Sequence, residues 1–229
     1  MKVHLARSRR FVLGPIAALL LFATSAFAGP PLICHTIEIG QAKSLPWISH
    51  NWELTGTENY DLKNLVPDTL AILDSNTPVL VRMETLRRAT LYAEKNSQIA
   101  KELLTKLHAR ATNAESAGRP DALAWFDDGY LIEAYKQLYW KSQNPASGLD
   151  GYAWVVKAIN LRGSDPEMEF AAALITLGSQ QANHQDHVLK ATVGAKADPL
   201  LAQNLASRFI GSDSPTISQM FAKAVSPKQ

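Results

Sequence analysis

Two stretches of the chain decide the expected fold, because they repeat one pattern: VVKAINLRGSDP at residues 155–166 and VLKATVGAKADP at residues 188–199. In each, two apolar residues, a lysine and an alanine are followed by six residues and then by Asp-Pro. The same offset of 33 residues relates Ala173 to Ala206 and Gly178 to Gly211. We interpret each copy as two short antiparallel helices joined by tight turns. Because one such pair cannot bury its apolar face alone, several pairs are expected to stack.

Signals for helix starts recur along the chain outside this repeat, from about residue 64. A capping residue followed by proline marks the first turn of a helix, because the missing N–H of proline would have no partner there. Such pairs are Thr77-Pro78, Asp165-Pro166, Asp198-Pro199 and Ser214-Pro215. Further helices are predicted from Ser97, as the capping residue, and over about residues 120–141 and 149–161. No run alternates between apolar and polar residues as a strand would, so the sequence predicts an all-α fold.

The period of 33 residues, with Ala158-Ile159-Asn160-Leu161 near the end of a second helix, resembles a tetratricopeptide repeat. One full unit would run from Leu131 to Leu161, and the resemblance covers about residues 120–225. The Trp-x-x-Leu-Gly-x-x-Tyr signature of that family is missing, and Pro166 follows Leu161 later than in the motif. The resemblance implies an α-solenoid of stacked antiparallel helix pairs, with a groove that binds a partner and no reaction of its own.

Residues 1–28 have the three regions of a secretory signal peptide: a positive start, an apolar run and the small residues of Ala26-Phe27-Ala28 at the cleavage site. We expect cleavage after Ala28 and a periplasmic or secreted protein that is then free of the membrane. A retained anchor is the alternative, since the apolar run approaches the length of a spanning helix. Four of the 23 Lys and Arg lie in this segment, and none of the 21 Asp and Glu does. Cleavage therefore changes the formal charge from +2 to −2. Without a basic excess, nothing favours nucleic-acid binding.

Residues 29–60 are expected to form an extended N-terminal arm that lies along an α-helical repeat domain at residues 61–229. The arm is rich in proline and glycine, and its apolar residues are isolated. The segments GPPLICH at residues 29–35 and SLPW at residues 44–47 resemble the start of uncharacterised secreted bacterial proteins, a resemblance that implies no activity.

Cys34 is the only cysteine, so no intramolecular disulfide can form. In an oxidising compartment the Cys34 thiol can form an intermolecular disulfide, bind a metal or be buried. Thiolate and imidazole both bind borderline metals, so a metal- or thiol-handling protein that uses Cys34-His35 is the alternative function. Adjacent side chains of an extended segment point to opposite faces, however, so a packed arm residue is the preferred interpretation.

His184 and His187 are three residues apart and would share one face of a helix, with Asp186 between them to orient a ring. A solvated helix start is the preferred interpretation of this pair. Together with Cys34 and His35 the two histidines would complete a tetrahedral metal site, but nothing in the sequence brings the four together. No cofactor is predicted.

Aromatic residues are concentrated between residues 125 and 154, where eight of the 15 that follow Ala28 are found. Core packing explains part of this cluster, but Tyr and Trp are also favoured anchors at binding interfaces. The candidates for partner binding are Trp125, Tyr130, Tyr135, Tyr139 and Trp140. The neighbouring Asp127-Asp128 is expected on a solvated helix face, because adjacent helix positions diverge by about 100° and do not face one substrate atom.

Motifs for catalysis are absent from the sequence: there is no Gly-x-Ser-x-Gly elbow, His-Glu-x-x-His helix, phosphate-binding glycine loop or Cys-x-x-Cys pair. The leading hypothesis is an exported helical-repeat module that binds a protein or peptide partner. An enzyme with an unrecognised site is the third possibility.

Overall fold

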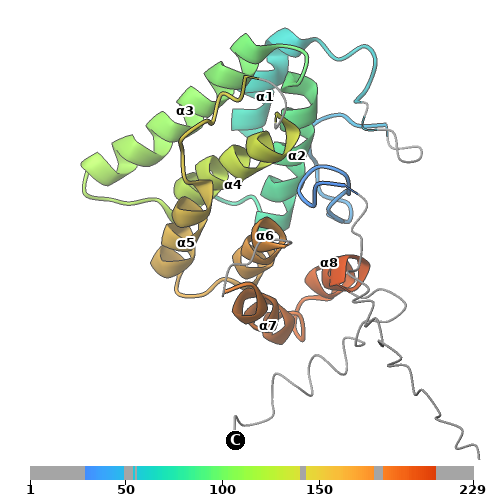
Figure 1. The fold of residues 1–229 in the computed structure, drawn as a ribbon, viewed down its shortest axis with the longest axis vertical. Helices are drawn as coiled ribbons and strands as arrows, with labels where there is room; N and C mark the ends of the chain where they lie inside the picture. Colours follow the sequence, from blue (N-terminus) through green and yellow to red (C-terminus); the bar gives the residue numbers. More distant parts are fainter. Residues whose placement is uncertain (1–28, 49–53, 55, 140–142, 178–182, 210–229) are drawn as a thin grey trace, which may run out of the picture.

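The computed structural model describes residues 29–48, 54, 56–139, 143–177 and 183–209. Within these ranges all regular structure is helical, which confirms the predicted all-α class. The elements are the 3-10 helix η1 (Leu62–Asn64) and the α-helices α1 (Leu65–Ile72), α2 (Val79–Ala93), α3 (Ser97–Ser116), α4 (Ala122–Leu138), α5 (Gly151–Arg162), α6 (Pro166–Thr176), α7 (His184–Gly194) and α8 (Pro199–Phe209). Figure 1 shows α2 and α4 in the middle of the molecule, with α6, α7 and α8 at one end. The expected signal peptide and Ser214-Pro215 lie outside the described residues.

Both Asp-Pro pairs of the repeat begin helices. Asp165 caps α6 and Asp198 caps α8, each by accepting hydrogen bonds from the backbone N–H groups two and three residues later, at 3.0 to 3.2 Å. The two copies of the motif therefore hold corresponding places, since one lies in α5 before α6 and the other in α7 before α8. At α3 the prediction was one residue late, because Asn96 rather than Ser97 supplies the cap. Tetratricopeptide-like stacking of these pairs stays a prediction.

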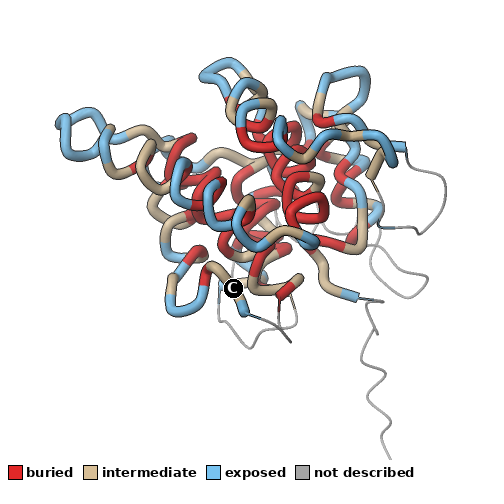
Figure 2. The backbone as a smooth tube through the Cα atoms, turned by 90° about the horizontal axis from the view of Figure 1, so that it is seen from above, coloured by how far each residue is buried: buried red, intermediate tan, exposed pale blue. Residues whose placement is uncertain are grey.

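Helices α2 and α4 form the centre of the fold, because α4 packs against α2, α3, α5 and α6. Figure 2 shows the buried residues gathered inside the bundle and the exposed ones on its rim. The contact between α4 and α5 depends on Gly129 and Gly151. A Cβ atom on Gly129 would lie 2.6 Å from the carbonyl oxygen of Gly151, so the two backbones meet where no side chain fits.

The N-terminal arm, seen here in residues 29–48, is not helical and packs into the core. Its buried apolar side chains are Leu32, Ile33, Ile37 and Leu45. Arg87 of α2 donates a hydrogen bond to the carbonyl oxygen of Ile33 at 3.1 Å. Arg208 of α8 donates to the carbonyl oxygens of His35 and Thr36, both at 2.9 Å. The arm therefore lies between α2 and α8 and joins them, as Figure 1 shows.

Glu84 of α2 is fully buried and links the arm to two arginines. One carboxylate oxygen accepts from Arg87 Nη2 at 2.9 Å and from Arg88 Nε at 2.7 Å. The other accepts from Arg87 Nε at 2.7 Å and from the backbone N–H of Ile37 at 2.9 Å. Four hydrogen bonds thus compensate the carboxylate for the loss of water.

Candidate functional site

The aromatic candidates for partner binding lie in the core. The four that the structure describes are between 0% and 6% exposed: Trp125, Tyr130, Tyr135 and Tyr139. Tyr135 donates its hydroxyl to the carbonyl oxygen of Ala100 in α3 at 3.1 Å, and Tyr139 donates to that of Ala93 in α2 at 2.9 Å. Trp140 lies outside the described residues. Because all four rings are buried, they pack inside the bundle and form no exposed patch.

The expectation of a solvated face for Asp127 and Asp128 is wrong, since both are fully buried. Asp127 Oδ2 lies 2.6 Å from Arg82 Nη1 of α2 and forms a buried ion pair with it. Asp128 Oδ2 lies 2.9 Å from His108 Nδ1 of α3. Burial raises the pKa of Asp128 to about 6, against the opposing effect of His108. The two carboxyl groups bind different side chains, Arg82 and His108, so each has its own partner in the core.

Cys34 and His35 lie in the arm, both partly buried. Burial raises the pKa of the Cys34 thiol and lowers the pKa of His35. Within the part of the chain that the structure describes, no three His, Cys, Asp or Glu side chains are grouped to hold a metal ion. Cys34, His35, His184 and His187 are therefore not gathered into one site. His184 Nδ1 instead lies 3.1 Å from Thr176 Oγ1.

His187 is buried, which corrects the expectation of a solvated helix start. It is the middle member of a hydrogen-bonded group, Tyr152, His187 and Glu169, which we call the α5–α7 relay. Tyr152 Oη lies 2.8 Å from His187 Nε2, and His187 Nδ1 lies 2.5 Å from Glu169 Oε2. Asp186, expected to orient a histidine ring, pairs with Lys190 at 2.8 Å instead. The group that orients the ring comes from α6, not from α7.

A polar pocket of about 350 Å³ lies where the N-terminal ends of α2, α6 and α8 meet. Its lining includes residues from three of the capping-residue–proline starts noted in the sequence: Thr77, Pro78, Asp165, Pro166 and Asp198. Glu167, from the first turn of α6, also lines it, as does Arg162 from the end of α5. We call this cavity the three-helix pocket.

Glu167 connects the helices around the three-helix pocket. Its Oε2 accepts a hydrogen bond from the backbone N–H of Leu80 at 3.0 Å, so a side chain of α6 caps α2. Burial, followed by the negative charges of Asp165 and Asp198, raises the pKa of Glu167 to about 7. Arg162 is 41% exposed, and its Nε lies 3.0 Å from Asp165 Oδ2. Near neutral pH Glu167 therefore keeps its proton in part of the molecules.

The three-helix pocket and the α5–α7 relay were not predicted as sites. The recurring proline pairs indicated where helices start, but no local feature of a start shows that three of these starts lie close together.

No helix among the described residues is long and apolar enough to cross a membrane. Comparison with protein-family models, curated proteins and solved structures finds no match to this chain.

Proposed function

We propose that the protein is an exported module that binds a protein or peptide partner, and that the three-helix pocket receives a cationic group of that partner. The observation that carries this proposal is the pocket itself, a concave polar site with an acidic lining. The proposal moves the binding site away from the aromatic cluster, since the described rings of that cluster are buried.

The charges of the three-helix pocket favour a cation over an anion. Three carboxyl groups line it, from Asp165, Glu167 and Asp198, against the single guanidinium of Arg162. Asp165 already pairs with Arg162. Burial, followed by the negative charges of Asp165 and Asp198, raises the pKa of Glu167. An ammonium or guanidinium group would take the place of the Glu167 proton and make charge-assisted hydrogen bonds with the carboxylates of Glu167 and Asp198.

The alternative function, metal or thiol handling by Cys34-His35, gains no support from the described residues. Only the thiolate is nucleophilic and binds metals, and burial raises the pKa of Cys34. The arm that carries the pair is also fixed to α2 and α8 through its backbone.

The test compares labelled basic, acidic and neutral peptides of equal length, with binding followed by fluorescence anisotropy. The double variant Glu167→Gln/Asp198→Asn keeps the shapes and the capping oxygens of both side chains. It should weaken binding of the basic peptide by about tenfold or more, because hydrogen bonds to charged groups are worth ~1.5–3 kcal/mol.

The matched control is Glu115→Gln/Asp186→Asn, which removes the same charge from two exposed carboxylates outside the pocket. It should leave the affinity unchanged. Equal losses in the two double variants would show that only net charge matters. The absence of any preference for the basic peptide would also contradict the proposal.

A further inference from the structure

We propose that Tyr152 is a nucleophilic phenol, activated by His187 and Glu169, that accepts an acyl group from an activated ester. This inference rests on the α5–α7 relay alone and is independent of the three-helix pocket. A partner could bind at the pocket whether or not Tyr152 reacts.

The first support is the order of the three groups. A hydroxyl, an imidazole and a carboxylate are joined through the two ring nitrogens of His187, at 2.8 Å to Tyr152 Oη and 2.5 Å to Glu169 Oε2. When Nδ1–H donates a hydrogen bond to Glu169, Nε2 of the ring is left to accept the phenol proton. This is the arrangement by which a positioned base activates a hydroxyl nucleophile.

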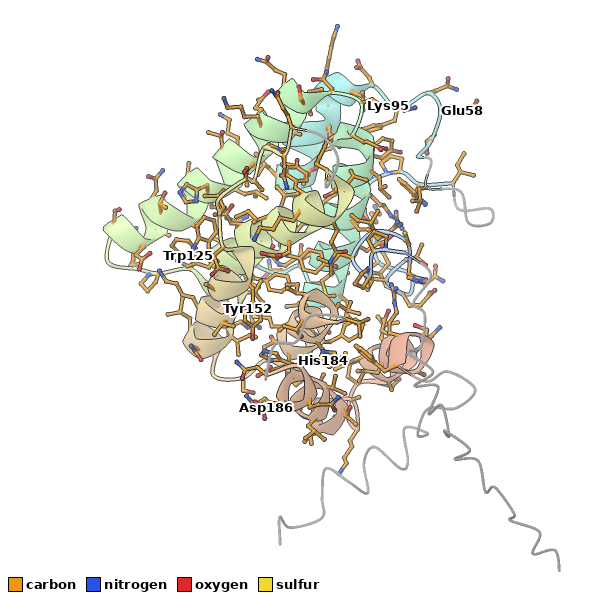
Figure 3. The ribbon with its side chains drawn as sticks, viewed as in Figure 1. Glu58, Lys95, Trp125, Tyr152, His184 and Asp186 are labelled. Atoms are coloured by element: carbon orange, nitrogen blue, oxygen red, sulfur yellow. The ribbon has the colours of Figure 1, made fainter. Side chains whose placement is uncertain are left out.

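The second support is the gradient of burial along the relay. The side chains of His187 and Glu169 are 7% and 1% exposed, whereas Tyr152 is only partly buried. Water therefore competes little for the base and its carboxylate, whereas part of Tyr152 is exposed at the surface. Figure 3 labels Tyr152 on α5, at the end of the molecule that also holds His184 and Asp186 of α7.

The third support is the fixed position of the outer members. Glu169 Oε1 lies 3.5 Å from Lys190 Nζ and accepts a hydrogen bond from Ser164 Oγ at 3.4 Å. The lysine and the serine thus hold this carboxyl group beside the ring of His187. At the other end, the backbone N–H of Tyr152 donates to Glu133 Oε1 at 3.0 Å, which fixes the start of α5. The relay is thus held from four helices.

The reaction of such a site with p-nitrophenyl acetate balances without a further reagent. The Tyr152 oxygen attacks the acetyl carbon while its proton passes to His187 Nε2. A new C–O bond forms to Tyr152, the ester C–O bond breaks, and p-nitrophenolate leaves with the bonding electrons. His187 then gives the proton to p-nitrophenolate. The products are O-acetyl-Tyr152 and p-nitrophenol.

The experiment treats the full chain with p-nitrophenyl acetate at pH 7 and follows the acetylation of each tyrosine by peptide mass spectrometry. Tyr60 is the matched internal control, because it is also partly buried but donates its hydroxyl directly to Asp68 Oδ2 at 2.7 Å. Burial and Asp68 raise the pKa of Tyr60, and among the residues that the structure describes no imidazole is bonded to its hydroxyl. Tyr152 should react about a hundredfold faster, the lower end of what a positioned general base contributes.

Three variants, checked for folding by circular dichroism, locate the effect. Tyr152→Phe should abolish acetylation at this position, and His187→Gln should reduce the Tyr152 rate to that of Tyr60. Tyr60→Phe should leave the Tyr152 rate unchanged. Equal rates at Tyr152 and Tyr60 in the unaltered chain would overturn the proposal without any variant. A fast Tyr152 in folded His187→Gln would overturn it as well.

Discussion

Replacing Glu84 with glutamine should loosen the arm from α2 and lower the free energy of unfolding by about 3–5 kcal/mol. Each carboxylate oxygen of Glu84 accepts two hydrogen bonds, from Arg87, Arg88 and the backbone of Ile37. Whichever way the new amide is turned, its nitrogen faces two donors, so two bonds are lost. Since a hydrogen bond to a charged group is worth ~1.5–3 kcal/mol, the count of lost bonds agrees with this range.

Urea unfolding followed by circular dichroism measures this change. With a slope of about 2 kcal/mol/M for a chain of this size, the midpoint of Glu84→Gln should fall by about 2 M. Hydrogen exchange should show that the Ile37 amide, which is bonded to Glu84 at 2.9 Å, opens more often in the variant.

Glu115→Gln is the matched control, because it makes the same chemical change in a surface ion pair. Glu115 is 46% exposed and lies 2.6 Å from Lys157 Nζ, so its loss should lower stability by less than about 1 kcal/mol. Midpoints for the two variants within about 0.5 M of each other would refute the reasoning that burial makes Glu84 decisive.

Three further predictions concern the centre of the fold and the three-helix pocket. Gly129→Ala should lower the melting temperature, because its Cβ would lie 2.6 Å from the Gly151 carbonyl oxygen and overpacking costs about 1–3 kcal/mol; an unchanged melting temperature contradicts this. Burial raises the pKa of Glu167 from its ordinary 4.5 to about 7, so the folded protein keeps a proton that the unfolded chain has lost. The contribution of Glu167 to the free energy of unfolding therefore falls as pH rises from about 4.5 to 7. Urea titrations should show that Glu167→Gln loses less stability between pH 5 and pH 8 than the unaltered chain does. An equal fall in the variant would show that other groups cause it. Asp165→Ala should lose about 1 kcal/mol through the α6 cap, whereas Asp165→Asn should keep most of it in thermal unfolding; equal melting of the two excludes a capping role.

Features of the fold that depend on neighbouring residues were predictable from the sequence. Asp165 and Asp198 cap helices through contacts with the next three residues, so the pattern alone located α6 and α8. The arm, whose contacts with the helices are long-range, was expected to lie along the helical body only from its prolines and isolated apolar residues. Its burial goes further than expected, because Ile37 and Leu45 belong to the core itself.

Features that depend on distant residues were not predictable. Arg82 and Asp127 are 45 residues apart, and each looks like a surface residue until α2 and α4 come together. The aromatic cluster suggested an exposed surplus of rings because a surface helix buries only one face. Helix α4 instead buries most of its residues, since α2, α3, α5 and α6 all pack against it. The spacing of His184 and His187 indicated a shared face but could not show that Glu169 arrives from a different helix.

The link between the arm and α8 has a consequence for the order of folding. Glu38 and Asn204 exchange two hydrogen bonds of 2.9 Å, although 166 residues separate them. Closing so long a loop is entropically unfavourable, and such contacts are expected to form after the local helices have paired. Interactions made late contribute little to the speed of folding and more to the barrier against unfolding. Substitutions at Asn204 should thus alter the lifetime of the native protein more than the rate at which it is reached.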